Sequence, residues 1–391
     1  MKHKILRIAT VPIYMNIVLK GQLKYLNQFY NVIAATSYDQ KHFNEIQMRE
    51  GVATHKVDLC RTIKPFEDLK ALFQLIQLIR NEKPILIHTH TPKAGLLGML
   101  AGLIMRVPIR IHTVTGMPLM GATGLKRKLL IVIEKLTYAM ATMVYPNSHA
   151  LKDYIQENNF VKKTKLKVLS NGSTNGVDTV IFDPIQLDSK KNLRLFYKIE
   201  DDAFVFLFVG RIAKEKGIEE LVLSLVNLTK QYPENKIKLL LIGTFERQHG
   251  SLPIQTELFI EKHLDIITLG RFDDVRPFYK LSDVFVLPSY REGFPNSVLE
   301  AGAMGLPSIV TDINGCNEII TNNSNGYIVP VQDEKALYLA MEEMLLQSEK
   351  LEKMGNISRE IICKRYGRQY ILESLKLEYD FLLTNTKNTN E

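Results

Sequence analysis

Short apolar runs alternate with longer amphipathic stretches along nearly the whole of this 391-residue chain. The apolar runs have the length of buried strands, and the stretches between them have the length and period of helices. Strands that alternate with helices favour parallel sheets with helices on both faces. This alternation constrains the fold more than any other feature of the sequence, and it occurs in both halves of the chain.

The first half predicts seven strands with helices between them. The strands are expected at residues 5–9, 31–36, 52–57, 85–88, 109–114, 142–145 and 166–169. The helices are expected at residues 66–81, 94–105, 126–141 and 150–157.

The second half repeats this pattern with six expected strands and five expected helices. The strands are expected at residues 204–209, 237–242, 266–269, 284–287, 308–311 and 326–329. The helices are expected at residues 218–231, 253–263, 276–281, 297–304 and 334–347. Between the halves, the polar and glycine-rich segment 170–178 is typical of a linker.

Composition places the chain among globular proteins, with 46% hydrophobic and 24% charged residues. At about 100–200 residues per domain, its length suggests two domains. Cys60, Cys316 and Cys363 are widely spaced and form no Cys-x-x-Cys pair, so neither a disulfide framework nor a zinc site is supported. We expect a cytoplasmic protein, because no signal-peptide pattern and no apolar run of about 20 residues is present.

The net charge of +8 conceals a strong asymmetry between the two halves. Residues 1–170 carry 25 Lys and Arg against 10 Asp and Glu, a balance of +15, whereas the remainder has a balance of −7. A basic half suits nucleic acid or an anionic membrane surface. No nucleic-acid-binding motif is present, so we expect no nucleic acid. An anionic membrane surface is the favoured partner, and ordinary surface charge is the alternative.

The segment 289–302 reads Ser-Tyr-Arg-Glu-Gly-Phe-Pro-Asn-Ser-Val-Leu-Glu-Ala-Gly and directly follows an expected strand. A helix is expected to begin near Asn296 or Ser297, and its N-terminus offers N–H donors and a partial positive charge that suit a phosphate. Glu292 before the turn and Glu300 in the helix can face one cavity and accept hydrogen bonds from hydroxyl groups. Alternatively, Ser297 and Glu300 form a capping box, in which Glu300 only binds its own helix.

The E-G-x-P-x-x-x-x-E-A pattern in this segment resembles the signature of family-4 glycosyltransferases, retaining enzymes of the GT-B fold that use nucleotide sugars. The resemblance implies an α/β protein of two Rossmann-like domains whose parallel sheets face a central cleft. We expect an acceptor-side domain at 1–170 and a nucleotide-sugar-binding domain at 171–365. A C-terminal helix at 366–383 is expected to pack back toward the N-terminal domain, followed by a frayed tail at 384–391.

A second motif, Gly-Arg-Ile-Ala-Lys-Glu-Lys-Gly at 210–217, follows another expected strand. It resembles the diphosphate-binding motif of the same family. Arg211 and Lys216 would then neutralise the diphosphate leaving group. The alternative is a solvated basic loop.

The same resemblance assigns the donor contacts. Glu300 would hold the ribose hydroxyls, Glu292 a hydroxyl of the donor sugar, and the backbone amides that follow would cover sugar and phosphate. Segment 267–272 resembles the lining of the base pocket, although Arg271 could equally be a surface residue. The donor-binding residues implied are Gly210, Arg271, Gly293, Phe294, Pro295, Asn296, Ser297 and Glu300.

His88 and His90 lie two apart at the end of an expected strand. They lack a third metal ligand in the sequence, so we reject a metal site there. His88 is interpreted as a structural histidine. His90, at the strand exit, is expected to face the cleft, and the family's H-x-H pattern implies contact with donor or acceptor.

Two positions depart from the family pattern. Many members carry Thr-Val-His-Gly where this chain has Thr-Val-Thr-Gly, so Thr115 replaces a histidine that contacts the donor sugar. Thr115 can donate a hydrogen bond but cannot act as a base. The segment 10–22 has no glycine before Gly21, where the family has a glycine-rich loop, and Pro12 and Tyr14 are expected to stiffen this turn for an acceptor-side role. It also excludes a dinucleotide-binding fingerprint.

The motifs together predict a retaining glycosyltransferase that moves a hexose or N-acetylhexosamine from a UDP-sugar to a growing glycan. The catalytic candidates are Arg211, Lys216, Glu292, His90 and Thr115. The family mechanism implies front-face attack, with the departing phosphate assisting deprotonation of the acceptor. No metal is expected, because the cations replace it and no Asp-x-Asp motif stands at a strand end.

The acceptor is expected to be a polyprenyl-diphosphate-linked glycan in bacterial polysaccharide or oligosaccharide assembly. The protein would then act at the inner face of the cell membrane as a peripheral protein. Two alternatives remain at the level of sequence: a UDP-sugar 2-epimerase of the same fold, and a non-catalytic nucleotide-sugar-binding subunit. Sugar-nucleotide interconversion without acceptor favours the first, and measurable transfer excludes the second.

Overall fold

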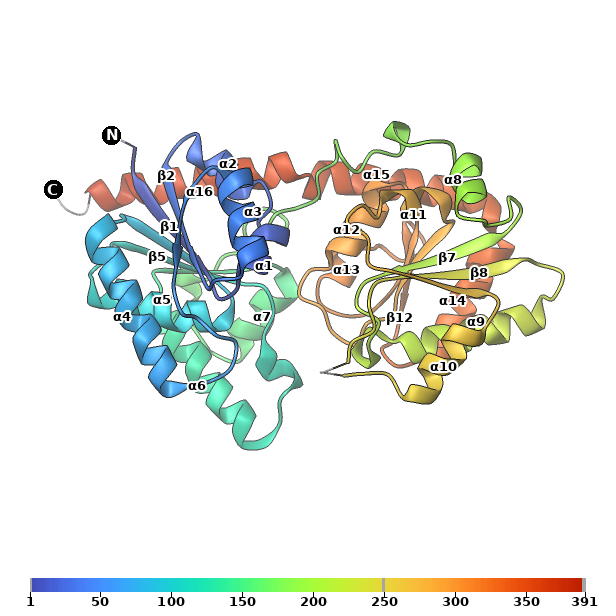
Figure 1. Ribbon diagram of the computed structural model, residues 1–391, viewed down its shortest axis with the longest axis horizontal. Helices are drawn as coiled ribbons and strands as arrows, with labels where there is room; N and C mark the ends of the chain where they lie inside the picture. Colours follow the sequence, from blue (N-terminus) through green and yellow to red (C-terminus); the bar gives the residue numbers. More distant parts are fainter. Residues whose placement is uncertain (1, 248–249, 389–391) are drawn as a thin grey trace. The chain divides into compact units, whose positions relative to one another are not determined.

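The computed structural model describes residues 2–247 and 250–388. The chain divides into two compact units, one made of Met1–Asn175 with Arg368–Glu391 and the other of Gly176–Gly367. Each unit contains one six-stranded, wholly parallel sheet with helices packed against it (Figure 1). The expectation of two Rossmann-like units is confirmed.

The N-terminal sheet has the strand order β3-β2-β1-β4-β5-β6. Its strands are β1 (Lys4–Ala9), β2 (Asn31–Thr36), β3 (Ala53–Lys56), β4 (Leu86–His90), β5 (Ile109–Val114) and β6 (Met143–Pro146). The seventh strand expected at 166–169 is wrong. Leu166 makes a single bridge to Val144, and Lys167 then turns its side chain to Glu378, so no ladder continues.

Side chains of the N-terminal strands alternate between two hydrophobic cores, because successive residues of a strand point to opposite faces. Leu6 and Ile8 enter one core, and Ile5 and Ala9 enter the other. The helices of this unit are α1 (Pro12–Ile17), α2 (Gln22–Asn27), α3 (Gln40–Glu50), α4 (Pro65–Glu82), α5 (Pro92–Ile104), η1 (Pro118–Gly121), α6 (Gly124–Met140), α7 (His149–Glu157), η2 (Lys163–Lys165) and α16 (Arg368–Asn388).

The segment after β1 is helical, whereas the sequence suggested only a stiffened turn. Pro12 begins α1, because its fixed φ suits the first helical position and its missing N–H has no intrahelical role there. Helices α1 and α2 have six residues each, too few to show a period in the sequence, and α3 buries only two apolar residues, Phe43 and Ile46.

The C-terminal sheet has the strand order β12-β11-β10-β7-β8-β9, and all six expected strands are confirmed. Its strands are β7 (Phe204–Val209), β8 (Ile237–Ile242), β9 (Ile266–Gly270), β10 (Val284–Leu287), β11 (Ser308–Thr311) and β12 (Gly326–Val329). Its helices are η3 (Pro184–Gln186), α8 (Lys190–Phe196), η4 (Lys214–Lys216), α9 (Ile218–Gln231), α10 (Ile254–Lys262), α11 (Arg276–Leu281), α12 (Asn296–Ala303), α13 (Cys316–Ile319), α14 (Glu334–Leu346), η5 (Ser348–Lys350) and α15 (Leu351–Tyr366).

The C-terminal helix α16 belongs to the N-terminal unit, where it packs against α2 and β5 (Figure 1). The chain passes from one unit to the other at Asn175 and again at Gly367; the first of these positions lies inside the glycine-rich segment 170–178. The tail expected to fray from residue 384 is helical through Asn388, and residues 389–391 lie outside the described part.

Both sheets have a point where successive connections run in opposite directions from a central strand. This point lies between β1 and β4 in the N-terminal sheet and between β7 and β10 in the C-terminal sheet. Ligands of open α/β sheets bind beyond the carboxyl ends of the strands at such a point. Functional side chains are therefore expected in the loops that follow these four strands.

Candidate functional site

The loops after β7 and β10 bring Lys216 and Glu292 together. The Lys216 ammonium donates a hydrogen bond to Glu292 Oε1, although the two residues are 76 positions apart. Both side chains are only 16% exposed, so this ion pair is largely shielded from water. Separate roles were expected for these two residues, and the fold brings their side chains into contact.

Backbone contacts fix the two loops against each other. The Tyr290 N–H donates to the Glu215 carbonyl at 2.9 Å. Gly217 has a left-handed φ of +68°, and a Cβ on it would lie 2.1 Å from the Pro288 carbonyl oxygen. Only glycine allows this approach, so Gly217 keeps the Lys216 loop against the end of β10.

Polar side chains orient the Glu292 turn. Ser289 Oγ donates to Glu292 Oε1 at 2.9 Å, and Asn314 Nδ2 donates to the Gly293 carbonyl at 2.9 Å. The neighbouring Gly315 has a left-handed φ of +78° and packs against this turn. A Cβ on it would lie 2.8 Å from the Gly293 carbonyl oxygen. The loop after β11 therefore supports the turn from behind.

Arg211 lies in a second charged cluster on the same edge. Its guanidinium pairs with Glu246 at 2.8 Å and with Glu215 at 2.8 Å, and its side chain is 50% exposed. Glu215 also pairs with Arg291 at 2.6 Å. Burial alone would raise the pKa of Glu215, but hydrogen bonds from Arg291 and Arg211 lower it, so this carboxylate stays ionised. The half-exposed Arg211 is thus held at the rim while its charge remains accessible.

Helix α12 begins just after the Glu292 turn, with Pro295 as its N-cap and no side-chain cap. The first two amides, those of Asn296 and Ser297, have no possible acceptor inside the helix. The capping-box interpretation is wrong, because Ser297 lies inside the helix and cannot be the N-cap. Pro295 has no N–H, so the expected row of donating amides is interrupted at that residue.

Glu300 lies one turn into α12 and accepts a hydrogen bond from the buried Tyr279 hydroxyl at 3.0 Å. Burial, and then the charge of Glu300, holds the pKa of Tyr279 well above its usual value. Tyr279 therefore remains a hydrogen-bond donor at physiological pH. It acts from α11 to set the position of the Glu300 carboxylate.

Arg271 is placed apart from these groups. It follows β9 and is exposed, and β8 separates β9 from β7 in the sheet. Phe272 next to it packs edge-on against Phe278, with ring centroids 4.7 Å apart. The expected base-pocket segment therefore follows the edge strand β9, two strands away from β7 and the loop that carries Lys216.

His90, in the N-terminal unit, is buried with 1% of its surface exposed, contrary to the expectation that it faces an open cleft. Arg7 Nη2 donates to His90 Nε2 at 2.7 Å. Because a guanidinium can only donate, Nε2 must accept and the proton of the neutral ring sits on Nδ1. Burial, and then the charge of Arg7, holds the pKa of His90 well below its usual value. His90 is therefore a fixed neutral side chain.

Arg7 points into the core on the α16 side of the sheet, as its place between Leu6 and Ile8 requires. It is fully buried and also donates to Tyr379 and Gln22. His88 bonds to the Tyr379 hydroxyl at 2.6 Å and to Thr113 at 2.6 Å, which confirms it as a structural histidine.

Thr115 follows β5 and is half-buried. The nearby Tyr14 hydroxyl is buried, and burial raises the pKa of Tyr14 to about 12, an effect that the hydroxyl of Thr115 partly offsets. Thr115 therefore belongs to a neutral, hydroxyl-rich part of this edge.

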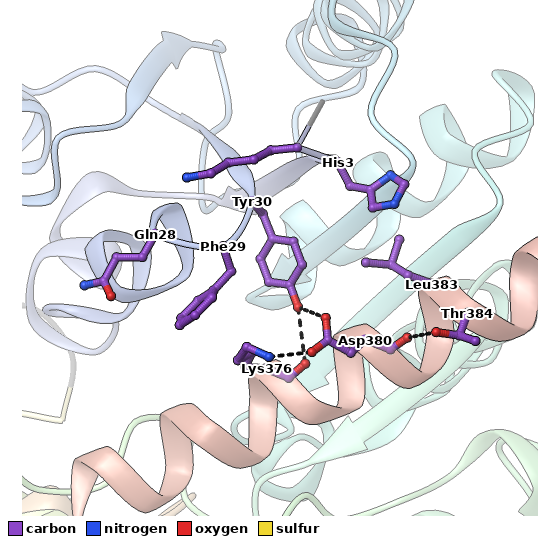
Figure 2. A pocket seen from close by; sticks show the side chains of 9 residues that line it. His3, Gln28, Phe29, Tyr30, Lys376, Asp380, Leu383 and Thr384 are labelled. Carbon is purple, nitrogen blue, oxygen red and sulfur yellow. Dashed lines mark hydrogen bonds and ion pairs between the residues drawn. The ribbon is translucent and has the colours of Figure 1, made fainter.

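Two hollows lie in the N-terminal unit. One, of about 30 Å³, is lined by His88, His90 and Asn147 among others and has room for a water molecule. The other, of about 760 Å³, lies before β1 and β2, where Tyr30 and Asp380 point toward each other and bond at 2.6 Å (Figure 2). Because it lies at the amino ends of the strands, we assign it no part in the site.

Within residues 2–247 and 250–388, no group of three or more His, Cys, Asp or Glu side chains is arranged to hold a metal ion. The same described part contains no helix with the length and apolar character needed to span a bilayer.

Several residues of the site were not identified from the sequence. They are Arg7, Glu215, Glu246, Tyr279, Ser289, Arg291 and Asn314. Arg7 did leave a signal, since it is a charged residue inside an otherwise apolar strand. Tyr279 left none, because its partner Glu300 lies on a different helix and neither spacing nor composition relates them.

The chain matches two protein families. The family described as "Glycosyl transferases group 1" matches residues 189–361, and "Glycosyl transferase 4-like domain" matches residues 30–172. The capsular polysaccharide biosynthesis glycosyltransferase CapM of Staphylococcus aureus is 33% identical over 386 residues, which are 98% of this chain and 99% of that protein. A UDP-Gal:alpha-D-GlcNAc-diphosphoundecaprenol alpha-1,3-galactosyltransferase of Escherichia coli is 32% identical over 286 residues, 70% of either chain.

A solved structure, Anabaena Alr3699/HepE in complex with UDP, aligns with a TM-score of 0.80 at 17% identity. The alignment covers 96% of this chain and 99% of that one. Likeness at this level of identity concerns the fold alone. It confirms the expected GT-B fold.

Proposed function

This chain belongs to the group 1 glycosyltransferases, and we propose that it is a retaining enzyme that transfers a hexose or N-acetylhexosamine from a UDP-sugar. The acceptor we propose is a polyprenyl-diphosphate-linked glycan in polysaccharide or oligosaccharide assembly. A relative named as acting on a diphosphoundecaprenol-linked sugar, with UDP-Gal in its name, supports both choices. The solved structure with UDP supports the donor class.

The observation that carries this proposal is the meeting of Lys216 and Glu292 beyond β7 and β10. Without a donor, Glu292 neutralises Lys216. A bound diphosphate would replace Glu292 as the ion-pair partner of Lys216. Glu292 could then accept a hydrogen bond from a hydroxyl of the donor sugar. Arg211 at the rim and the first amides of α12 would add further positive potential around the phosphates.

The transfer we propose breaks the bond between the anomeric carbon and the diphosphate oxygen and forms a bond from that carbon to an acceptor hydroxyl oxygen on the same face. The acceptor proton passes to an oxygen of the departing diphosphate. Stabilising the charge on that diphosphate would be the largest catalytic contribution, and in this proposal Lys216 and Arg211 would supply it without a metal.

Glu300 would hold the ribose hydroxyls of the donor, oriented by Tyr279. Gly210, Gly293, Phe294, Pro295 and the first amides of α12 would form the backbone wall of the donor site, and Arg271 would line its base end. Thr115 would donate a hydrogen bond in the N-terminal unit. For His90 we propose no direct contact with substrate, because it is buried and its Nε2 is taken by Arg7.

The basic N-terminal half, with a balance of +15 over residues 1–170, supports peripheral attachment to an anionic membrane from the cytoplasmic side. A lipid-linked acceptor would be presented at that surface.

A thermal-shift screen of nucleotides and nucleotide sugars on the purified protein tests the donor. A ligand at 100 times its Kd stabilises a protein by about 2.7 kcal/mol. We expect UDP and a UDP-sugar to raise the melting temperature and ADP or GDP to do so less. Absence of any shift with UDP-linked ligands would reject the donor class. Incubation of the stabilising UDP-sugar without acceptor then tests the epimerase alternative, because an epimerase would interconvert the sugar and a transferase would not.

A further inference from the structure

Helix α6 of the N-terminal unit exposes an apolar stripe, although Leu130, Ile131 and Met140 on the same helix pack against the core. Leu125, Leu129, Val132 and Leu136 follow one another at spacings of four, three and four, which places them on one face, and all four are exposed. The only acidic residue of this fully described helix, Glu134, is buried instead. An apolar stripe of this kind normally faces the core, so its exposure requires an explanation.

A second exposed stripe lies on α4, where Phe66, Leu69 and Phe73 share one face and Phe66 is 91% exposed. Helix α5 packs against both α4 and α6, and the three helices lie along the same side of the sheet (Figure 1). Contiguous exposed apolar surface of this kind marks an interaction site in soluble proteins.

The stripes begin at the functional edge of the unit. Helix α4 follows β3, and α6 follows β5 through η1, so both helices start near the carboxyl ends of the strands. Phe66 and Leu125, in the first turns, are the most exposed members of their stripes. The apolar surface is therefore most prominent at the edge where Thr115 lies.

Basic residues accompany the apolar stripe of α6. Lys126 lies in its first turn and Lys128 directly after it; both are exposed, and the first turn contains no acidic residue. Cations at a helix N-terminus oppose the helix dipole, so these lysines weaken the isolated helix. A negatively charged partner outside the protein would reverse that effect.

We propose that the exposed faces of α4 and α6 form a docking surface for an anionic lipid bilayer, with Phe66 and Leu125 inserted among the acyl chains and Lys126 and Lys128 among the headgroups. This inference rests on the lipid-linked acceptor of the proposed function and assigns the membrane contact to particular residues. A lipid surface fits better than a second copy of the chain, because a two-fold interface pairs the same patch of both copies and would set one basic α6 surface against another. On α6, large apolar side chains with lysines beside them form the pattern of interfacial helices, whereas the first turn of α4 carries Glu67 and Asp68.

Sedimentation with vesicles of phosphatidylcholine, with and without phosphatidylglycerol, tests this surface. We expect the wild-type protein to sediment with the anionic vesicles. The double variant Lys126→Gln with Lys128→Gln should weaken binding to the anionic vesicles by about fivefold per lysine. The effect of these substitutions should be smaller at high salt, because salt screens the attraction. Phe66→Ser with Leu125→Ser should weaken the binding by more than tenfold, because burial of a Phe or Leu side chain is lost at each position.

Matched controls come from the C-terminal unit. Leu264 is 89% exposed, so Leu264→Ser removes a similar apolar side chain, and Lys335→Gln with Lys353→Gln removes the same charge. The controls should partition like the wild type. A wild-type protein that ignores anionic vesicles, or α4 and α6 variants that behave like the controls, would overturn the proposal. So would a dimer in light scattering that dissociates on Phe66→Ser with Leu125→Ser without any vesicle binding.

The UDP thermal shift separates this surface from the proposed function. The α4 and α6 variants should keep the wild-type shift with UDP, because their residues lie in the other unit from Lys216 and Glu292. Vesicle binding that follows the variants while UDP gives no shift would leave the docking surface standing and reject the donor. A normal UDP shift with no vesicle binding by any form would leave the UDP-sugar donor standing and reject the docking surface.

Discussion

The two sheets share one topology but treat charge at their switch points in opposite ways. Beyond β7 and β10, Lys216 and Glu292 form an ion pair that is largely shielded from water, and Arg211 is held half-exposed between two carboxylates. Beside β1 and β4, Arg7 is fully buried, and its three side-chain partners, Tyr379, Gln22 and His90, are all neutral.

The proposed function gives this difference a reason, since one edge would bind an anion and the other would not. A lysine paired with a glutamate could exchange that glutamate for a phosphate, because its charge would be neutralised in either case. A buried arginine surrounded by neutral donors and acceptors instead fixes its neighbours in one protonation state, because a second charge in that environment is strongly disfavoured. The switch point of the C-terminal sheet is therefore suited to binding a charged ligand, and that of the N-terminal sheet to holding neutral side chains in place.

The sharpest test of the charged edge removes its cations. Lys216→Ala or Arg211→Ala should lower kcat by about 100-fold or more, the range for loss of one preorganised donor to a developing charge. Arg276, which pairs with Asp274 in the same unit, provides the control, and Arg276→Ala should leave kcat unchanged. Normal rates in both Lys216→Ala and Arg211→Ala would show that this edge does not neutralise the leaving group.

Substitutions of Glu300 and Glu292 should affect different steps, one the binding of UDP and the other the transfer of the sugar. Glu300→Gln should weaken UDP binding by about 1.5–3 kcal/mol, because the amide loses the charge and one acceptor for the ribose hydroxyls. Glu292→Gln should lower transfer without weakening UDP, since UDP carries no donor sugar. Titration calorimetry measures both affinities. An equal loss of UDP affinity in the two variants would mean that their roles are misassigned.

Acid should weaken the N-terminal unit through its buried histidines. Burial lowers the pKa of His112 to about 4, so the folded state keeps it neutral while the unfolded state takes up a proton below about pH 6.5. The stability due to this residue is complete above that pH and falls as the pH drops toward 4. At pH 5 the loss is about 2 kcal/mol for this one group.

Urea unfolding at pH 7.5 and pH 5 measures this loss, and His112→Gln should reduce the difference between the two pH values. The C-terminal unit offers a comparison within the same molecule, since His263, its one described histidine, is only half-buried. A transition of the N-terminal unit that did not change over this pH range would contradict a buried neutral histidine.

The smallest expected effect concerns the support of Glu300. Tyr279→Phe removes the hydroxyl that donates to Glu300 and should weaken UDP binding by about 0.5–1.5 kcal/mol, less than Glu300→Gln. Calorimetry on both variants and on their combination measures the coupling. If Tyr279→Phe has its full effect even in the Glu300→Gln background, the tyrosine does not act through that carboxylate.

The local pattern of the sequence determined most of the architecture. Twelve of the thirteen expected strands form, because an apolar run between polar turns is a local property that decides burial wherever the strand is placed. The exception, 166–169, has an apolar pattern too, but the sheet ends at β6 with a single bridge to Leu166. The family resemblance carried by Glu292, Glu300 and the 210–217 motif was also readable from the sequence, and the family and fold comparisons confirm it.

The tertiary structure alone decided which charges meet. Lys216 and Glu292 become partners because β7 and β10 are neighbours, and strand order depends on the packing of the whole sheet rather than on any local pattern. His90 was expected to face outward from its place at a strand end, yet Arg7 on the neighbouring strand holds it inside. Short-range periodicity determines which face of an element is apolar, whereas the partner of a polar group depends on residues far away in the chain.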